Sequence, residues 1–371
     1  MPGPAALRSI LRLGLIAAAL PGYGEIKADA TQAEAMLQLL EQCKAGTVPA
    51  HAVERVIALP GTQLIIGQQN ISRRITPQQY ETVLQCACRG EVAHVEPSGP
   101  GARAEKGAQG LMEDVAPALI WGREHIPALQ KRLEIATQNR DFDRAVTIAM
   151  ENLPEKIDLA PKFYLVMGGR AGAAALDEGI YIDLLSDAWR ARDHAMTSPE
   201  MVEFFAHEAH HIGYDGILER KREKLDLTES QMRAWNFLVN LLMEGSATLL
   251  INAHGSWADL ERMNHIQPDL ARLPELLPSA QNILRGCLDG TMTDRQYELA
   301  VSEFFGEGYH ATGARLLFAI QEARGKAALL RVMDDPRILL AAYNECVGNE
   351  VFRFNPRLAE RLEKLFSQRV H

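Results

Sequence analysis

Apolar residues recur every three or four positions over most of this chain, which is the spacing of an amphipathic helix. Between residues 31 and 152 the pattern predicts helices at 31–43, 52–58, 63–69, 76–88, 111–136 and 141–152. Residues 95–109 interrupt the pattern with three glycines and two prolines, a composition typical of an exposed loop. The N-terminal part of the chain is therefore expected to be helical, with one long loop.

Three shorter stretches carry a strand pattern instead. Residues 163–167 are apolar, aromatic and uncharged, residues 179–184 follow with a similar pattern, and residues 25–28 predict a short strand. The glycine-rich stretch 168–175 predicts a turn or a close approach of another backbone, and its spacing fits no phosphate-binding motif. An extended peptide can pair with a free strand edge, so we expect strand 179–184 to offer such an edge to a substrate.

The most distinctive helical stretch is residues 201–213, MVEFFAHEAHHIG, in which His207, Glu208 and His211 form the pattern H-E-x-x-H. Two imidazoles four residues apart lie on one helix face, about 6 Å apart, and can share a zinc ion at about 2.0–2.1 Å from each nitrogen. Glu208 can then take a proton from water at the metal. The pattern also occurs by chance, but its apolar neighbours predict a buried helix, and buried imidazoles need a partner or a metal.

Capping signals set the expected bounds of this helix and of a later one. Ser198, followed by a proline, predicts the start of the motif helix, and Gly213 predicts its end. Further on, Thr228 and Gln231 form a capping box, which predicts a helix that continues to about residue 250. This second helix is strongly apolar.

A catalytic zinc site needs three protein ligands and one open position, so the two histidines need a third. The metzincin continuation, with glycine and histidine three and six residues after His211, is absent. Glu244 is the best candidate because it is the only charged residue between 234 and 253, where a lone carboxylate is costly unless it is paired. The small residues Gly245-Ser246-Ala247 allow close helix packing. The alternative is a glutamate that reaches solvent or pairs with an arginine.

Length, net charge and cysteine content exclude several classes of protein. The chain has 371 residues, enough for one large two-lobed domain or two domains. Its net charge of −9 and its lack of a basic run argue against nucleic-acid binding, and no uninterrupted apolar run of about 20 residues predicts a transmembrane helix. The five cysteines are odd in number and irregularly spaced, so they imply no disulfide framework, and Cys86 and Cys88 are interpreted as helix packing.

The expected organisation has four parts. Residues 1–23 are a leader or weak signal-like segment, 24–94 an N-terminal helical lobe, 95–110 a loop, and 111–371 the catalytic region. The weak cleavage signal favours the cytoplasm, and export through the leader is the alternative. The sequence leaves the oligomeric state open.

The stretch His207-Glu208-Ala209-His210-His211, with Glu244-Gly245-Ser246-Ala247 downstream, resembles the gluzincin metallopeptidases. The layout from about residue 26 to 355 is similar to a bacterial family described as putative zinc-dependent peptidases. The resemblance implies a mostly helical α+β fold with a thermolysin-like catalytic lobe and one Zn²⁺ per chain. It implies His207, His211 and Glu244 as zinc ligands, Glu208 as general base, and a peptide or protein substrate. Many gluzincins place an aspartate four residues after the ligand glutamate, and Thr248 stands there in this chain.

Tyr309 and His310 stand at a predicted helix start between glycines, where either could stabilise an oxyanion beside the zinc, with Tyr309 preferred.

Two rival functions remain. Glu208-x-x-His211 and Glu307-x-x-His310 are two E-x-x-H motifs, which a di-iron carboxylate protein would combine with Glu244 and Glu303. That reading leaves His207 without a role. The third reading is a catalytically silent scaffold that binds peptides, for which an intact Glu208 is superfluous.

Overall fold

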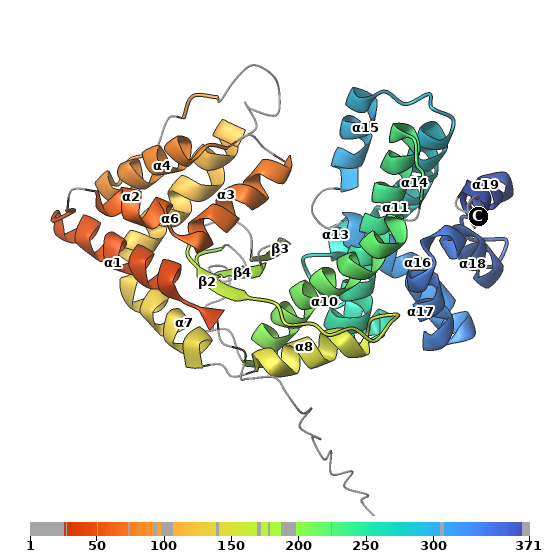
Figure 1. The fold of residues 1–371 in the computed structure, drawn as a ribbon, viewed down its shortest axis with the longest axis horizontal. Coiled ribbons are helices and arrows are strands. Elements are labelled where there is room, and N and C mark those ends of the chain that lie inside the picture. Colours follow the sequence, from red (N-terminus) through yellow and green to blue (C-terminus); the bar gives the residue numbers. More distant parts are fainter. Residues whose placement is uncertain are drawn as a thin grey trace, which may run out of the picture.

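The computed structural model describes residues 26–365 except 27, 50, 73–74, 93–94, 98–106, 139–140, 169–171, 177–178, 187–197, 224 and 305–307. The expected leader at 1–23 lies outside these residues, as does most of the expected loop at 95–110. The described chain is mostly helical and has one small mixed sheet (Figure 1). The expectation of a mostly helical α+β chain is confirmed.

The helices expected before residue 152 are all present. They are α1 (Thr31–Ala45), α2 (Ala52–Ile57), α3 (Pro60–Ser72), α4 (Pro77–Arg89), the π-helix η1 (Leu111–Val115), α6 (Ala116–Glu124), α7 (Ile126–Gln138) and α8 (Phe142–Glu151). The single helix expected at 111–136 is divided in three. One break falls at His125, two residues before Pro127, because a proline has no N–H and disfavours helical backbone ahead of it.

A disulfide joins α1 to α4. Cys43 and Cys88 are bonded, with their Cα atoms 4.7 Å apart, so the interpretation of Cys88 as helix packing is wrong. Cys86, Cys287 and Cys346 are free. The pair is separated by 45 residues, and only the packing of the two helices brings its sulfurs together, so the sequence spacing carries no signal of it.

The sheet has four strands in the order β1 (Ala28–Asp29), β2 (Phe163–Val166), β4 (Gly179–Asp183) and β3 (Ala173–Leu176). β1, β2 and β4 are parallel, and β3 is antiparallel to β4. β4 therefore has neighbours on both sides, and the expectation that it offers a free edge is wrong. The edge strand is β3, which overlaps the stretch 168–175 whose glycines predicted a turn. β3 packs against the motif helix.

The motif helix is α10 (Ser198–Arg222), and it runs well beyond the end expected at Gly213. A Cβ on Gly213 would lie 2.6 Å from the Leu153 side chain, so the glycine is required for close packing and does not stop the helix. The next residue, Tyr214, is fully buried and donates its hydroxyl proton to the Met333 carbonyl. These contacts hold the second half of α10 in place.

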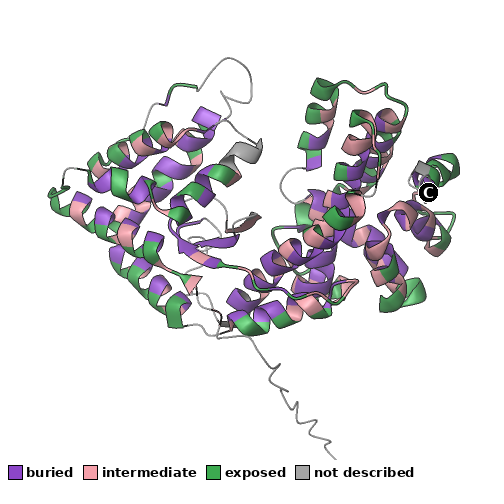
Figure 2. Cartoon of the chain, in the orientation of Figure 1, coloured by how far each residue is buried: buried purple, intermediate pink, exposed green. Residues whose placement is uncertain are grey.

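Two hydrophobic cores divide the described chain, and α10 belongs to both. The first core comprises α1–α8, the sheet and the start of α10, and the second comprises the end of α10 and the helices that follow it. Phe205 of α10 packs against Phe142 and Phe163 in the first core, with ring centroids 4.5 and 5.4 Å away. The H-E-x-x-H residues therefore lie on α10 where the two cores meet. Buried residues occur in the helices of both cores (Figure 2).

The second half of the chain is entirely helical in its described residues. Its elements are α11 (Glu229–Ser246), the π-helix η2 (Ala247–Asn252), α12 (Trp257–Leu260), α13 (Gln267–Ala271), α14 (Leu273–Leu288), α15 (Asp294–Val301), the 3-10 helix η3 (Ser302–Phe304), α16 (Gly308–Arg324), α17 (Lys326–Asp334), the 3-10 helix η4 (Pro336–Ile338), α18 (Leu339–Cys346) and α19 (Pro356–Leu365). The expected capping box at Thr228 and Gln231 opens α11. By length and composition, Glu229–Asn252 is apolar enough to cross a membrane, but it is largely buried inside the protein.

α11 and α16 cross at two glycines that touch through their backbones. A Cβ on Gly313 would overlap the Leu241 carbonyl oxygen and lie 2.8 Å from the Gly245 Cα atom. A Cβ on Gly245 would likewise meet the backbone of Gly313. The two helices can approach this closely only because neither position has a side chain. The crossing places Glu244 of α11 beside the start of α16.

We predict that Gly313→Ala lowers the free energy of unfolding by about 3 kcal/mol, the upper end for overpacking, because the new methyl meets backbone that no rotamer change can move. Urea denaturation measures the change. Gly348→Ala is the matched control, since a Cβ there meets nothing within 4 Å. A Gly313→Ala protein as stable as this control would contradict the role of the crossing.

Candidate metal centre

The three motif residues lie on the partly shielded face of α10. The side chains of His207 and His211 are 12% and 10% exposed, and Glu208 is buried. The two imidazole centroids are 4.6 Å apart, and ligand atoms of all three residues lie within 4.8 Å of one another. The local helix geometry thus brings these groups together as expected from their spacing.

Glu244 reaches this group from α11. Its Oε2 atom lies 3.1 Å from the His211 Nε2 atom and 3.6 Å from the His207 Nε2 atom. A third imidazole, that of His310 on α16, places its Nε2 atom 3.0 Å from the same oxygen. Glu244 and His310 keep side-chain exposures of 25% and 22%, so the cluster can be reached from solvent.

The electrostatics of the cluster follow from these contacts. Burial acts against the charge of Glu244, but His211 and His310 outweigh it and hold the pKa of this carboxyl well below its usual range. Burial also acts to lower the pKa of His211, and the charge of Glu244 and the hydrogen bond to it raise this pKa overall. His210 is fully buried, and burial, followed by His211 and His207, lowers its pKa well below the usual range, so it is neutral. Glu244 is therefore ionised at neutral pH.

Asn252 orients His207. The Asn252 Oδ1 atom is 2.6 Å from the His207 Nδ1 atom, so Nδ1 donates to the amide oxygen and Nε2 is the ring nitrogen that faces Glu244. In an α-helix Asn252 would lie about 80° around the axis from Glu244, since each residue turns about 100°. The π-helix η2 turns less per residue, because its hydrogen bonds span five residues. It therefore brings Asn252 back toward the face of Glu244.

Asn252 was not among the residues singled out from the sequence. Thr248 stands where many gluzincins have the orienting aspartate, so another group was needed; Thr248 is buried, and its hydroxyl has no hydrogen-bond partner among the described residues. The sequence does carry one signal of it, because Asn252 is the first amide or carboxyl side chain after Glu244. The π-helical register, however, has no signature in the sequence.

The remaining predicted site residues lie away from this cluster or outside the described residues. Tyr309 packs against Phe237 and Phe304, with ring centroids 5.6 and 5.4 Å away, and its side chain is hydrogen-bonded to Asn240. Burial raises the pKa of its hydroxyl.

Glu303 is exposed and accepts a hydrogen bond from Ser279. Glu307 lies outside the described residues. Of the two residues considered for an oxyanion role, the structure brings His310 to the cluster and places Tyr309 in an aromatic core.

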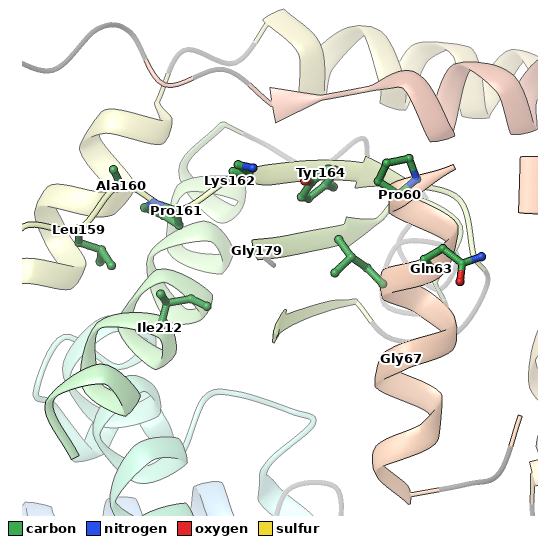
Figure 3. A pocket seen from close by; sticks show the side chains of 11 residues that line it. Pro60, Gln63, Gly67, Leu159, Ala160, Pro161, Lys162, Tyr164, Gly179 and Ile212 are labelled. Carbon is green, nitrogen blue, oxygen red and sulfur yellow. The ribbon is translucent and has the colours of Figure 1, made fainter. Parts of the chain in front are cut away.

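A pocket of about 620 Å³ lies on the neighbouring face of α10 (Figure 3). Ile212, which follows His211, forms one wall. α3 forms the opposite wall, and the segment leading into β2 lies between them (Figure 3). The lining is largely apolar, with polar groups on Gln63, Lys162 and Tyr164. Because Ile212 is four residues after Glu208, the pocket and the general-base candidate share one side of the helix.

The donor set fits a zinc ion. In a tetrahedral zinc site with bonds of about 2.0–2.1 Å, neighbouring ligand atoms lie about 3.3 Å apart, close to the separations measured from Glu244. The separation between His207 Nε2 and Glu244 Oε2, at 3.6 Å, is too long for a hydrogen bond. With the Nδ1 side of His207 turned to Asn252, its Nε2 atom faces the Glu244 carboxylate. A zinc ion placed between them would be bound by both atoms.

Comparison with known proteins agrees with this chemistry. Residues 53–350, well over half of the chain, match the model of a family described as "Putative zinc dependent peptidase (DUF5700)". The matched span includes both the motif helix and Glu244. No curated protein and no solved structure matches the chain significantly.

We predict that Asn252→Leu weakens zinc binding about 10–100-fold, the usual effect of losing a partner that orients a metal-bound histidine. Competition with a coloured chelator measures the dissociation constant. Thr248→Val is the matched control, because it removes the hydroxyl of Thr248 without removing a hydrogen bond among the described residues. Equal zinc affinity in the two variants would show that Asn252 does not orient His207.

Proposed function

This chain belongs to the family of putative zinc dependent peptidases, and from that membership we propose that it hydrolyses peptide bonds with one bound zinc ion. The observation that carries the proposal is the convergence of His207, His211 and Glu244. Two imidazoles and a carboxylate from separate helices are the ligand set of a catalytic zinc in gluzincin-type hydrolases. Glu208, buried beside them, supplies the remaining group that such chemistry needs.

The proposed roles follow from the positions of the groups. Zinc, when bound, supplies Lewis acidity, which lowers the pKa of water and polarises the scissile carbonyl. The Glu208 carboxylate takes the proton of the attacking water and passes it to the leaving amine. Glu244 neutralises part of the metal's charge, and Asn252 keeps His207 in the tautomer that binds metal. His310 is placed to donate to an oxygen that gains negative charge.

We place the substrate backbone along β3. This strand is the edge of the sheet and packs against α10, so a peptide that adds to it would pass near the motif residues and be held by main-chain hydrogen bonds. The apolar pocket beside Ile212 would accept a substrate side chain. Together, the edge strand, α10 and α11 would form the thermolysin-like lobe that the sequence resemblance implies.

The rival functions have less support. A di-iron centre would need Glu303, whose carboxylate is exposed and paired with Ser279, and it would leave the position of His207 beside Glu244 without a purpose. A silent peptide-binding scaffold would not need Glu208. Metal analysis separates the first rival from the peptidase, because two irons per chain are expected in one case and one zinc in the other.

The direct test compares Glu208→Gln with the wild-type protein. We expect the variant to bind zinc as tightly as wild type and to lose peptidase turnover about 10²–10⁴-fold, the usual contribution of a general base. A quenched fluorescent peptide library measures turnover, and elemental analysis measures zinc. Wild-type turnover in Glu208→Gln would show that this carboxylate is not the base.

Glu244→Ala serves as the companion variant in the same experiment. Removing this carboxylate should weaken zinc binding itself, and turnover should return when zinc is in large excess, because Glu208 is intact. If Glu244→Ala holds zinc as tightly as wild type, then Glu244 is not a ligand. If wild-type protein holds zinc but cleaves no peptide in the library, the silent-scaffold reading is favoured.

A further inference from the structure

The imidazole of His310 lies closer to the Glu244 carboxylate than the imidazole of either motif histidine does. Its Nε2 atom lies 3.0 Å from the Glu244 Oε2 atom, compared with 3.1 and 3.6 Å for His211 and His207. His207, Glu244 and His310 form a group whose ligand atoms lie within 4.8 Å of one another. The His310 imidazole is therefore as near to the carboxylate as those of the two motif histidines.

From this proximity we propose that His310 is the fourth protein ligand of the resting metal centre, an inference that rests on the proposed zinc function. A tetrahedral zinc site places its ligand atoms about 3.3 Å apart, and the separation of His310 from Glu244 matches that edge as well as those of the other two histidines. The resting site would then be closed, with three imidazoles and one carboxylate.

The charges also favour this ligand set. The described residues give Glu244 three imidazole neighbours and no lysine or arginine. Three neutral imidazoles add no charge, and Glu244 and Glu208 together balance a divalent cation. If His310 were instead a cationic partner of Glu244, the metal and the histidinium would compete for one carboxylate in a partly buried space, which is unfavourable.

The fold holds His310 at this position. His310 is the third residue of α16, and the crossing of Gly313 with Gly245 lies one helical turn further on. The same contact that sets the distance between α11 and α16 therefore sets the distance between Glu244 and His310. The ring of His310 also stacks near that of His207, with centroids 5.8 Å apart and planes 24° apart.

A closed resting site has a consequence for catalysis. Water and the substrate carbonyl need a position at the metal, so His310 must leave when substrate binds, or the zinc must accept a fifth ligand. A histidine that has left would remain beside the reacting carbonyl and could donate to its oxygen. If His310 leaves, its ligand role and its oxyanion role would belong to successive states of one side chain.

X-ray absorption spectroscopy of the zinc-loaded protein tests the proposal directly. We expect three imidazoles per zinc in the wild type and two in His310→Ala, with a water oxygen in the place of the third. Chelator competition should show a loss of zinc affinity of about 100-fold or more, since losing a partner that only orients a ligand already costs about 10–100-fold.

Two further variants keep the result interpretable. His310→Asn keeps a group that can donate a hydrogen bond to Glu244 but is a poor zinc ligand, so it should lose affinity as His310→Ala does. His254→Ala removes an exposed histidine that pairs with Glu203 outside the cluster, and it should bind zinc as wild type does. Circular dichroism confirms that each variant is folded.

The outcomes separate this inference from the proposed function. Two imidazoles in the wild type, or wild-type affinity in His310→Asn, would overturn the fourth-ligand role and leave a three-ligand peptidase site in place. Wild-type protein that binds no zinc would overturn both. Three imidazoles that persist in His310→Ala would show that another histidine is the third ligand.

Discussion

The backbone contact between Gly245 and Gly313 is the constraint on which the candidate metal centre depends. It brings two helices together so closely that the carboxylate of Glu244 and the imidazole of His310 share one small space. A side chain at either glycine would meet the backbone of the other helix and push the helices apart. The site therefore depends on glycine at both positions of this crossing, next to Glu244 and three residues after His310.

The other half of the site depends on the anchoring of α10. Its first turns are fixed by aromatic packing around Phe205 and its later turns by the buried Tyr214, in two separate cores. The histidines lie between these anchors, where neither core covers them fully. A helix held at both ends can present two imidazoles at fixed positions, which is the preorganisation that a metal site needs. Asn252 then fixes the tautomer of one of them.

Local features of this chain could be predicted from its sequence, and features that depend on tertiary contacts could not. The spacing of His207 and His211 fixes their shared helix face, and the isolation of Glu244 in an apolar helix indicates a buried partner. The capping box at Thr228 likewise acts within a few residues. These expectations depend on neighbours along the chain.

The features that were missed depend on residues far apart in the sequence. Gly213 has the pattern of a helix stop, but the Leu153 side chain takes the space of its missing Cβ within a continuous helix. The alanines of β3 form a strand only because β4 pairs with them. The position of Asn252 depends on a π-helical register, and that of His310 on the crossing of α11 and α16. In each case packing overrides the local preference.

The most direct test of this account is a crystal of the zinc-soaked protein, with an anomalous difference map recorded at the zinc absorption edge. We predict one peak per chain, about 2.0–2.2 Å from a nitrogen of His207, a nitrogen of His211 and a carboxylate oxygen of Glu244. A peak bound elsewhere, or a Glu244 carboxylate turned toward solvent with no metal within bonding distance, would contradict the account.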